Sequence, residues 1–319
     1  MINFNYKRFY ISIFFFIFFL KFDAQTLKEA FFLAGNNKEN LMYVLDHYKV
    51  IGEEEKYQAA LFLIKNMSPQ ESHTYKWISN NGKVMKFSEL DYEDSDLAYK
   101  AFKRLKDSFN IIRKKVITKD IKVITSKELI RNIDHAFDAW KNNKWSQSYT
   151  FEIFCEYILP HRSIIEPLEP WREECAFLVR KAKYGLEKDD DPVEVCNNVM
   201  NTLKDFSFVS KNMTIPSPLL GTEQLLFRRE GSCPELANLA VLASRSIGLA
   251  VTFDFTPHHG ASSNRHFWNT VIDKHGTAIP FNGSSASDVK GMPYNYNPNN
   301  KRISKVFRRT YSIQNIALA

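Results

Sequence analysis

The sequence lacks most patterns that mark metal sites, repeats or membrane spans. Its four cysteines form no Cys-x-x-Cys pair and its eight histidines form no His-x-x-x-His pair, so no metal site is predicted. No internal repeat or low-complexity segment is present. The most apolar stretch, residues 11–20, is too short to cross a bilayer as a helix. These absences leave a globular protein as the expected class.

The composition supports a large hydrophobic core. The chain has 319 residues, of which 44% are hydrophobic and 25% are charged, and this length predicts two domains. The net charge of +7 is spread among both signs rather than clustered, so no nucleic-acid partner is predicted. No cofactor is predicted either.

The first residues have the pattern of a secretory signal. Lys7 and Arg8 precede the apolar stretch, and Ala24 offers a cleavage site. We therefore expect residues 1–24 to be a signal peptide and the mature protein to be secreted or periplasmic, in the cell envelope, without stable membrane insertion. The alternative is an uncleaved signal anchor.

An oxidising compartment gives the cysteines a possible role in disulfides. If Cys233 is a free nucleophile, then Cys155, Cys175 and Cys196 allow one disulfide and one spare thiol. Buried reduced cysteines are equally compatible with the sequence, which does not choose a pair.

Helices dominate the first half of the predicted fold, which is α+β overall. A helical N-terminal domain is expected over residues 25–147, followed by a second domain over 148–319. Apolar spacing predicts the helices, and β-branched residues predict one strand. The expected elements are helices over 27–65, 88–114 and 126–142, a turn-rich segment over 67–91, a strand over 116–124 and a late strand over 306–316.

Cys233 lies at the predicted start of a helix. Ser232 can cap that helix, Pro234 suits its first turn, and Gly248 suits its end. The free N–H groups and dipole of a helix start favour a thiolate, which is the attacking form of cysteine. The same amides could hold an oxyanion. The position therefore suits a nucleophile, although a buried cysteine that only fills space is the simpler alternative.

A predicted hairpin follows this helix and brings two polar residues together. Strands are expected over 249–255, 266–272 and 277–281, and the turn at 273–276 joins the last two. His266 opens the first strand of the hairpin and Asn282 follows the second. Because a hairpin brings its outer ends together, an Asn282 amide could accept the imidazole N–H and fix its tautomer.

These residues resemble the transglutaminase-like superfamily, of the secreted bacterial type with an N-terminal helical region. The resemblance is carried by G-S-C-P-E-L, R-H-F-W-N and I-P-F-N. It implies a papain-like, transglutaminase-like core with the Cys-bearing helix packed on an antiparallel β-sheet. It also implies Cys233, His266 and Asn282 as the catalytic residues, although the third position is more often Asp in that family.

Other side chains have weaker claims to a role in the site. Gln224 is a candidate donor to the oxyanion, and Trp268 is a candidate substrate contact for which packing in the core is the favoured alternative. A metal held by Cys233 with His258 or His259 lacks supporting spacing. Three charged residues could line a cleft, but a structural salt-bridge cluster is the simpler interpretation; they are Arg162, Glu166 and Arg172.

The sequence thus predicts a secreted or periplasmic Cys-His-Asn enzyme that acts by acyl transfer on the peptide or amide bonds of a protein or peptide substrate. The acceptor could be water, as in a cysteine peptidase or amidase, or an amine, as in a transglutaminase. The alternative is a non-catalytic module that keeps the fold and binds peptide or glycan.

Overall fold

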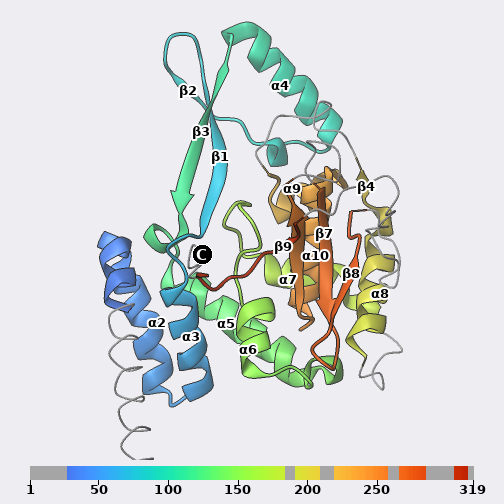
Figure 1. The fold of residues 1–319 in the computed structure, drawn as a ribbon. Coiled ribbons are helices and arrows are strands. Elements are labelled where there is room, and N and C mark those ends of the chain that lie inside the picture. Colours follow the sequence, from blue (N-terminus) through green and yellow to red (C-terminus); the bar gives the residue numbers. More distant parts are fainter. Residues whose placement is uncertain (1–26, 184–190, 209–218, 258–265, 285–304, 315–319) are drawn as a thin grey trace, which may run out of the picture.

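The structure of the protein is a computed structural model that describes residues 27–183, 191–208, 219–257, 266–284 and 305–314 (Figure 1). Helices and antiparallel sheets combine in a mixed α+β fold, as predicted. The expected signal peptide lies outside the described residues. Within them, no helix has the length and apolar character needed to cross a membrane.

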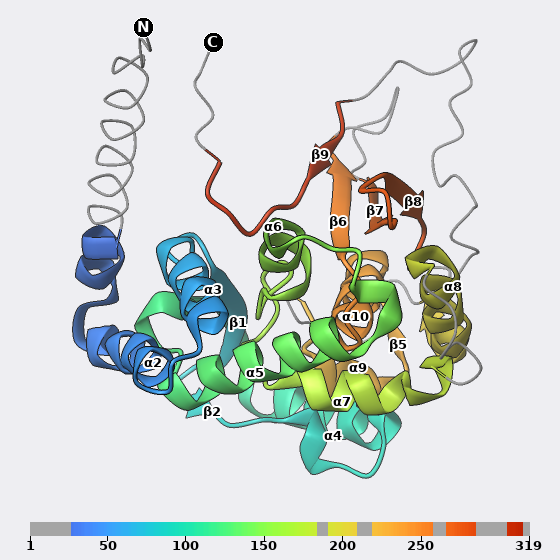
Figure 2. The same cartoon turned by 90° about the horizontal axis from the view of Figure 1, so that it is seen from below.

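The N-terminal helices form one side of the molecule (Figures 1 and 2). A helix over residues 27–34 is followed by α2 (Lys38–Val50), α3 (Glu54–Lys65) and, after an intervening segment, α5 (Ser126–Asn142). Leu41, Val44 and Tyr48 are buried along one face of α2, as the helical spacing of apolar residues predicts. At the start of α5, Thr125 and Glu128 form a reciprocal capping box.

Between α3 and α5 the chain forms a projecting arm, which we define as residues 71–119 (Figure 1). Its elements are β1 (Glu71–Ile78), β2 (Val84–Met85), η2 (Glu89–Asp91), α4 (Ser95–Phe109) and β3 (Ile112–Lys119). The predicted turn-rich segment is wrong over β1, because Asn80 to Gly82 only closes the β1–β2 hairpin. The predicted strand over 116–124 begins earlier, at Ile112, because the preceding helix ends at Phe109 and is followed by left-handed Asn110.

The second half of the chain is built around α10 (Cys233–Ser246), which contacts helices on several sides and a sheet. The helices are α5, α7 (Trp171–Leu178), α8 (Pro192–Thr202) and α9 (Thr222–Arg228). The antiparallel sheet has the order β8-β7-β6-β9, with β6 (Val251–Thr256), β7 (His266–Ile272), β8 (Ala278–Phe281) and β9 (Phe307–Arg308). A short parallel pair, β4 (Ser207–Phe208) with β5 (Glu230–Gly231), leads into α10. The Cys-bearing helix packed on an antiparallel sheet was predicted.

The two predicted domains share a hydrophobic core across residue 147. Buried residues of α2, α3 and α5 pack with Phe154 and Ile158 of η5 (Phe154–Ile158), a π-helical stretch that follows α6 (Phe151–Ile153). The same cluster includes Ala250 and Tyr311. The predicted late strand is reduced to the two residues of β9. Beyond it, Tyr311 is buried between α3 and the segment after η5, because its hydroxyl contacts both Leu63 O (3.3 Å) and His161 Nδ1 (3.4 Å).

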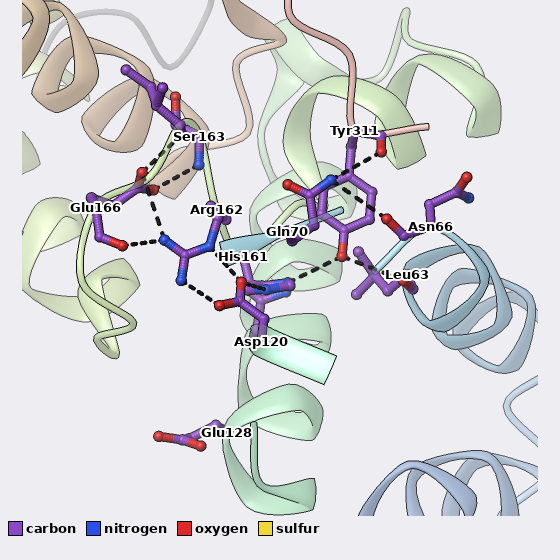
Figure 3. Close-up of polar contacts among 12 residues, drawn as sticks. Leu63, Asn66, Gln70, Asp120, Glu128, His161, Arg162, Ser163, Glu166 and Tyr311 are labelled. Atoms are coloured by element: carbon purple, nitrogen blue, oxygen red, sulfur yellow. Dashed lines mark hydrogen bonds and ion pairs between the residues drawn. The ribbon is translucent and has the colours of Figure 1, made fainter. Parts of the chain in front are cut away.

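A buried charged cluster beside Tyr311 connects η3 (Asp120–Lys122), the turn that follows the arm, to the second half of the chain (Figure 3). The Arg162 guanidinium forms a bidentate pair with the Asp120 carboxylate, and His161 Nε2 lies 3.0 Å from Asp120 Oδ2. The Glu166 carboxylate accepts the backbone N–H groups of residues 163 and 164. Arg162 and Glu166 therefore belong to an internal polar network, as the simpler sequence interpretation held.

None of the four cysteines, all of which are described, forms a disulfide. Cys155, Cys175 and Cys196 are buried in η5, α7 and α8, and Cys233 is half-buried. Of the two alternatives that the sequence left open, the structure has the one with reduced thiols.

Candidate active site

Cys233 is the first residue of α10, and a buried carboxylate holds the turn around it. Glu235 Oε2 accepts the backbone N–H of Ser232 at 2.8 Å and the Ser232 hydroxyl at 2.6 Å. The other oxygen, Glu235 Oε1, accepts the Leu220 N–H at 3.1 Å. One side chain thereby fixes the helix start and the segment that precedes α9. Cys233 itself, the residue held by this turn, is half-buried.

The helical spacing places Cys233 on the stripe of α10 that faces the sheet. Ala237 and Ala240 follow it at four and seven residues, which is the spacing of one helix face. The Ala237 carbonyl accepts a bond from Asn269 Nδ2 of β7 at 2.9 Å. A Cβ placed on Gly283 would lie only 2.7 Å from the Ala240 Cβ. This stripe therefore contacts β7 and the residues after β8.

The direction of α10 brings its start to the same end of the sheet as the start of β7. Near its other end, Arg245 Nε donates to the Val251 carbonyl at 3.2 Å, and Val251 pairs with Val271 late in β7. Ala237 instead meets Asn269, which lies closer to the start of that strand. Continuing along α10 from Ala237 to Cys233 therefore leads toward His266.

The strand register places the positions of His266 and Asn282 as diagonal neighbours. His266 is the first residue of β7 and pairs with Thr256. The pairing of Asn269 with Phe281 puts Asn282 next along, across from Trp268. Diagonal positions on adjacent strands are within reach of long side chains. The backbone thus brings the three predicted positions to one end of the sheet, and the meeting of sulfur, imidazole and amide stays a prediction.

Asn282 has an amide that is held by its own turn. Its Oδ1 accepts the Ser284 backbone N–H at 3.2 Å and the Ser284 hydroxyl at 2.7 Å. The side chain is half-buried. Two hydrogen bonds to one carbonyl oxygen fix the plane of the amide, and both come from Ser284.

The two weaker candidates lie in different surroundings. Trp268 is 4% exposed and pairs with Asp254 of β6, so most of its ring is in the protein interior. Gln224 Oε1 accepts the Gly221 N–H at 3.1 Å, and its Nε2 donates to Glu89 Oε1 of the arm at 2.6 Å. The Gln224 amide therefore links α9 to η2, and its oxyanion role stays a prediction.

Asn269 is a residue of the site that sequence reasoning missed. It is fully buried, donates to Ala237 O of α10, and accepts the Gly283 N–H at 3.2 Å. It thus joins the helix that bears Cys233, the strand that begins at His266, and the residue after Asn282. Gly283 has no side chain at this junction, and a Cβ there would overlap the Asn269 amide oxygen. The only sequence signal was the position of Asn269 in R-H-F-W-N.

A half-buried carboxylate holds the start of α9, the helix that leads to β5 and Cys233. Glu169 Oε2 lies 3.3 Å from the Glu223 N–H, and a Cβ on Gly221 would overlap the Glu169 carboxylate. Burial raises the pKa of Glu169 to about 7, with nearby Glu223 adding to the rise and the backbone N–H groups of α9 opposing it. This approach to the site therefore carries a group that titrates near neutral pH.

In the described part of the chain, no cluster of three or more His, Cys, Asp or Glu side chains is arranged to hold a metal ion. His258 and His259, which the sequence raised as metal ligands, lie outside the described residues.

Comparison with known proteins identifies a family for this part of the chain. The family model of the transglutaminase-like superfamily matches residues 180–282. The match begins before α8 and ends at Asn282, so it spans α10, β7 and β8. Neither the curated proteins nor the solved structures contain a match to the chain.

Proposed function

Because residues 180–282 form a transglutaminase-like superfamily domain, we propose that this protein is a Cys-His-Asn enzyme that transfers acyl groups from peptide or amide bonds. The observation that carries the proposal is the position of Cys233. Cys233 is half-buried at the start of a helix that is buried from Glu235 to Ser246, at the sheet end shared by the start of β7 and the residue after β8.

The proposed reaction has two steps. The Cys233 thiolate attacks the carbonyl carbon, and the backbone N–H of Cys233 donates to the oxyanion that forms. The C–N bond then breaks as protonated His266 gives its proton to the departing amine, which leaves a thioester. Water or a primary amine next attacks the thioester, His266 takes the proton of this acceptor, and the thiolate is released. Asn282 keeps the imidazole in the orientation that both transfers need.

An assay with two readouts tests the proposal. Fluorescein-labelled casein reports hydrolysis, and incorporation of a fluorescent primary amine into unlabelled casein reports transamidation. We expect turnover in at least one assay, which stops in Cys233→Ala and continues in Cys196→Ala, because Cys196 is a buried core residue of α8. Equal activity of the two variants would contradict a role for Cys233.

A specific observation favours a second candidate, the non-catalytic module that binds peptide or glycan. Asn282 Oδ1 already accepts two bonds from Ser284, whereas an orienting amide accepts the imidazole N–H through the same oxygen. The variant Ser284→Ala distinguishes the two. An enzyme is expected to change its rate or pH profile when this turn loosens. A binding module would show no turnover before or after the change, and casein would still be retained by Cys233→Ala.

We also propose that the protein is exported and loses residues 1–24. The basic residues, apolar stretch and Ala24 of the N-terminus support this. N-terminal sequencing of protein recovered from the envelope or medium should begin at Gln25. A product that retains Met1 and sediments with membranes would indicate a signal anchor instead.

A further inference from the structure

The arm ends in a long open strand edge. Its sheet has the order β2-β1-β3, so β3 has a neighbour on one side, and among the described residues no strand pairs with the other side. The strand is eight residues long and most of its side chains are exposed. Figure 1 shows β3 standing away from α10 and its sheet. A strand edge of this kind presents backbone N–H and C=O groups to an incoming chain.

Positive charge lies on both faces of this edge. Arg113, Lys114 and Lys115 are consecutive, and in the described part of the chain no carboxylate forms an ion pair with them. Alternation puts Lys114 on one face and the other two cations on the opposite face. Lys114 also pairs directly with Lys76 of β1, and like charges in that position repel. The edge therefore carries an unbalanced positive charge that an acidic partner would relieve.

Apolar and aromatic groups interleave with these cations. Ile112 is 63% exposed and Ile117 is 52% exposed, although each lies within a strand. The Arg113 guanidinium lies over the Tyr75 ring at 5.0 Å, and Tyr75 pairs with Lys115. Exposed isoleucines offer apolar area that charge alone would not explain, and they give an added strand something to pack against.

We propose that the β3 edge binds an extended acidic segment of a polypeptide partner, which adds to the sheet as a further strand. The partner's backbone would pair with the outer edge of β3, and its carboxylates would meet the cations on either face of the sheet. A second copy of this chain is a poorer occupant, because antiparallel pairing of β3 with itself would bring its lysine and arginine residues together. The inference stands apart from the acyl-transfer proposal, because it rests on the arm and not on Cys233.

The arm is joined to the candidate site through one buried residue. Glu89 of η2 is 3% exposed and forms an ion pair with Arg228 at the end of α9. It also accepts the bond from Gln224. Arg228 lies five residues before Cys233 in the sequence. A partner held by β3 would thus be bound to an element that is anchored on the approach to α10.

Labelled synthetic peptides as long as β3 test the proposal by fluorescence anisotropy with the full chain. We expect a peptide of alternating Glu and Val to bind, and a peptide of alternating Lys and Val not to bind. Alternating Glu and Pro has the same charge but cannot pair as a strand, so we expect it to bind at least about tenfold more weakly. Hydrogen exchange should show new protection of β3 amides with the Glu-Val peptide.

Matched charge reversals locate the site. Lys114→Glu with Lys115→Glu should weaken binding of the Glu-Val peptide by at least about tenfold. Lys103→Glu with Lys106→Glu makes the same change in net charge on exposed positions of α4, and binding should stay within about twofold. Equal losses in the two double variants, or equal binding of the Glu-Pro peptide, would overturn strand addition in favour of general attraction. A dimer in sedimentation that the β3 reversal dissociates would show that the occupant is a second copy.

Discussion

The two ends of α10 differ in burial and in hydrogen bonding. The start carries the proposed nucleophile, and the other end has a structural role. At its start, Cys233 is half-buried, and the capping hydrogen bonds come from Glu235, so the thiol itself takes no part in them. At its other end, Arg245 is 4% exposed and its guanidinium donates to the carbonyls of Val251 and Arg162. Burial, with the charge of Arg309, lowers the pKa of Arg245.

The difference shows how one helix can serve both purposes. The cation at the C-terminal end joins β6 and the segment after η5 to the helix and is shielded from solvent. Arg172 of α7 is buried beside it and binds the Arg245 carbonyl. With that end fixed, the N-terminal end can keep Cys233, the proposed nucleophile, half-buried without losing its position.

The largest effect should come from removing the thiol at the start of α10. Cys233→Ala is expected to lower kcat/KM in the casein assays by at least about 1,000-fold, because no other group supplies the nucleophile. Its stability in urea should be nearly unchanged. Cys196→Ala provides the reverse pattern, with activity kept and about 1 kcal/mol of stability lost from the core.

A substitution at the C-terminal end of α10 should lower stability rather than remove the nucleophile. Arg245→Met leaves the Val251 and Arg162 carbonyls without their donor, so we expect the free energy of unfolding to fall by about 2–4 kcal/mol. Urea unfolding measures this. Arg131→Met is the control, because its pair with Glu173 is exposed and should be worth less than about 1 kcal/mol. Similar losses in both variants would mean that burial of Arg245 contributes little.

The labelling rates of the thiols compare Cys233, at the start of α10, with the three cysteines buried inside helices. Burial raises the pKa of Cys155 to about 12 and raises those of Cys175 and Cys196 as well. Iodoacetamide at neutral pH should therefore label Cys233 at least about 100-fold faster than these three. Peptide mapping by mass spectrometry gives the rates, and labelling in urea should make all four alike. Fast labelling of Cys196 in the folded state would contradict the comparison.

Asn269 should affect the catalytic rate because it holds α10 and the residue after Asn282 in position. Asn269→Leu removes the bonds to Ala237 and Gly283, and we expect kcat to fall about tenfold or more with little change in KM. Thr270→Val is the control, because it removes a buried hydrogen bond to Asp254 from the next residue of β7. Thr270→Val should lower stability by a similar amount and leave kcat within about twofold. Equal effects on kcat would assign Asn269 a structural role only.

The smallest effect concerns pH and Glu169. Its pKa is raised by burial to about 7 in the folded protein, against about 4.3 in an unfolded chain. At a pH between these two pKa values, the Glu169 carboxyl is protonated in the folded state and ionised in the unfolded state. The stability contributed by this proton is complete below about pH 4.3 and is lost as pH rises through 7.

Glu169→Gln should therefore flatten this part of the stability profile. Melting temperatures at pH 5 and pH 8 measure it, and wild type should lose more on going to pH 8 than the variant does. Glu39→Gln, on an exposed position of α2, should follow wild type. Parallel profiles for wild type and Glu169→Gln would show that this carboxylate is ionised at both values.

Local patterns were sufficient for the elements that carry the candidate site. Ser232, Pro234 and Gly248 bound α10 within two residues of its observed limits, and β7 matches the predicted range. Capping groups, turn residues and apolar spacing act over a few residues. A short stretch of sequence is therefore enough to identify the elements that they determine. The papain-like core with its helix on an antiparallel sheet was instead implied by the resemblance to the transglutaminase-like superfamily. The arm was harder, because most residues of β1 are half-buried and no apolar residue of the strand is fully buried to reveal its period.

The sequence by itself determined that Cys233 begins a helix and that a hairpin starts at His266 and ends at Asn282. Only the tertiary structure decided that Asn269 joins α10 to the end of that hairpin, that Glu235 holds Leu220, and that Asp120 pairs with Arg162. The first group depends on neighbours along the chain, whose conformational preferences are local. The second depends on buried polar groups that must find partners after distant segments pack, and that requirement leaves no periodic mark in the sequence.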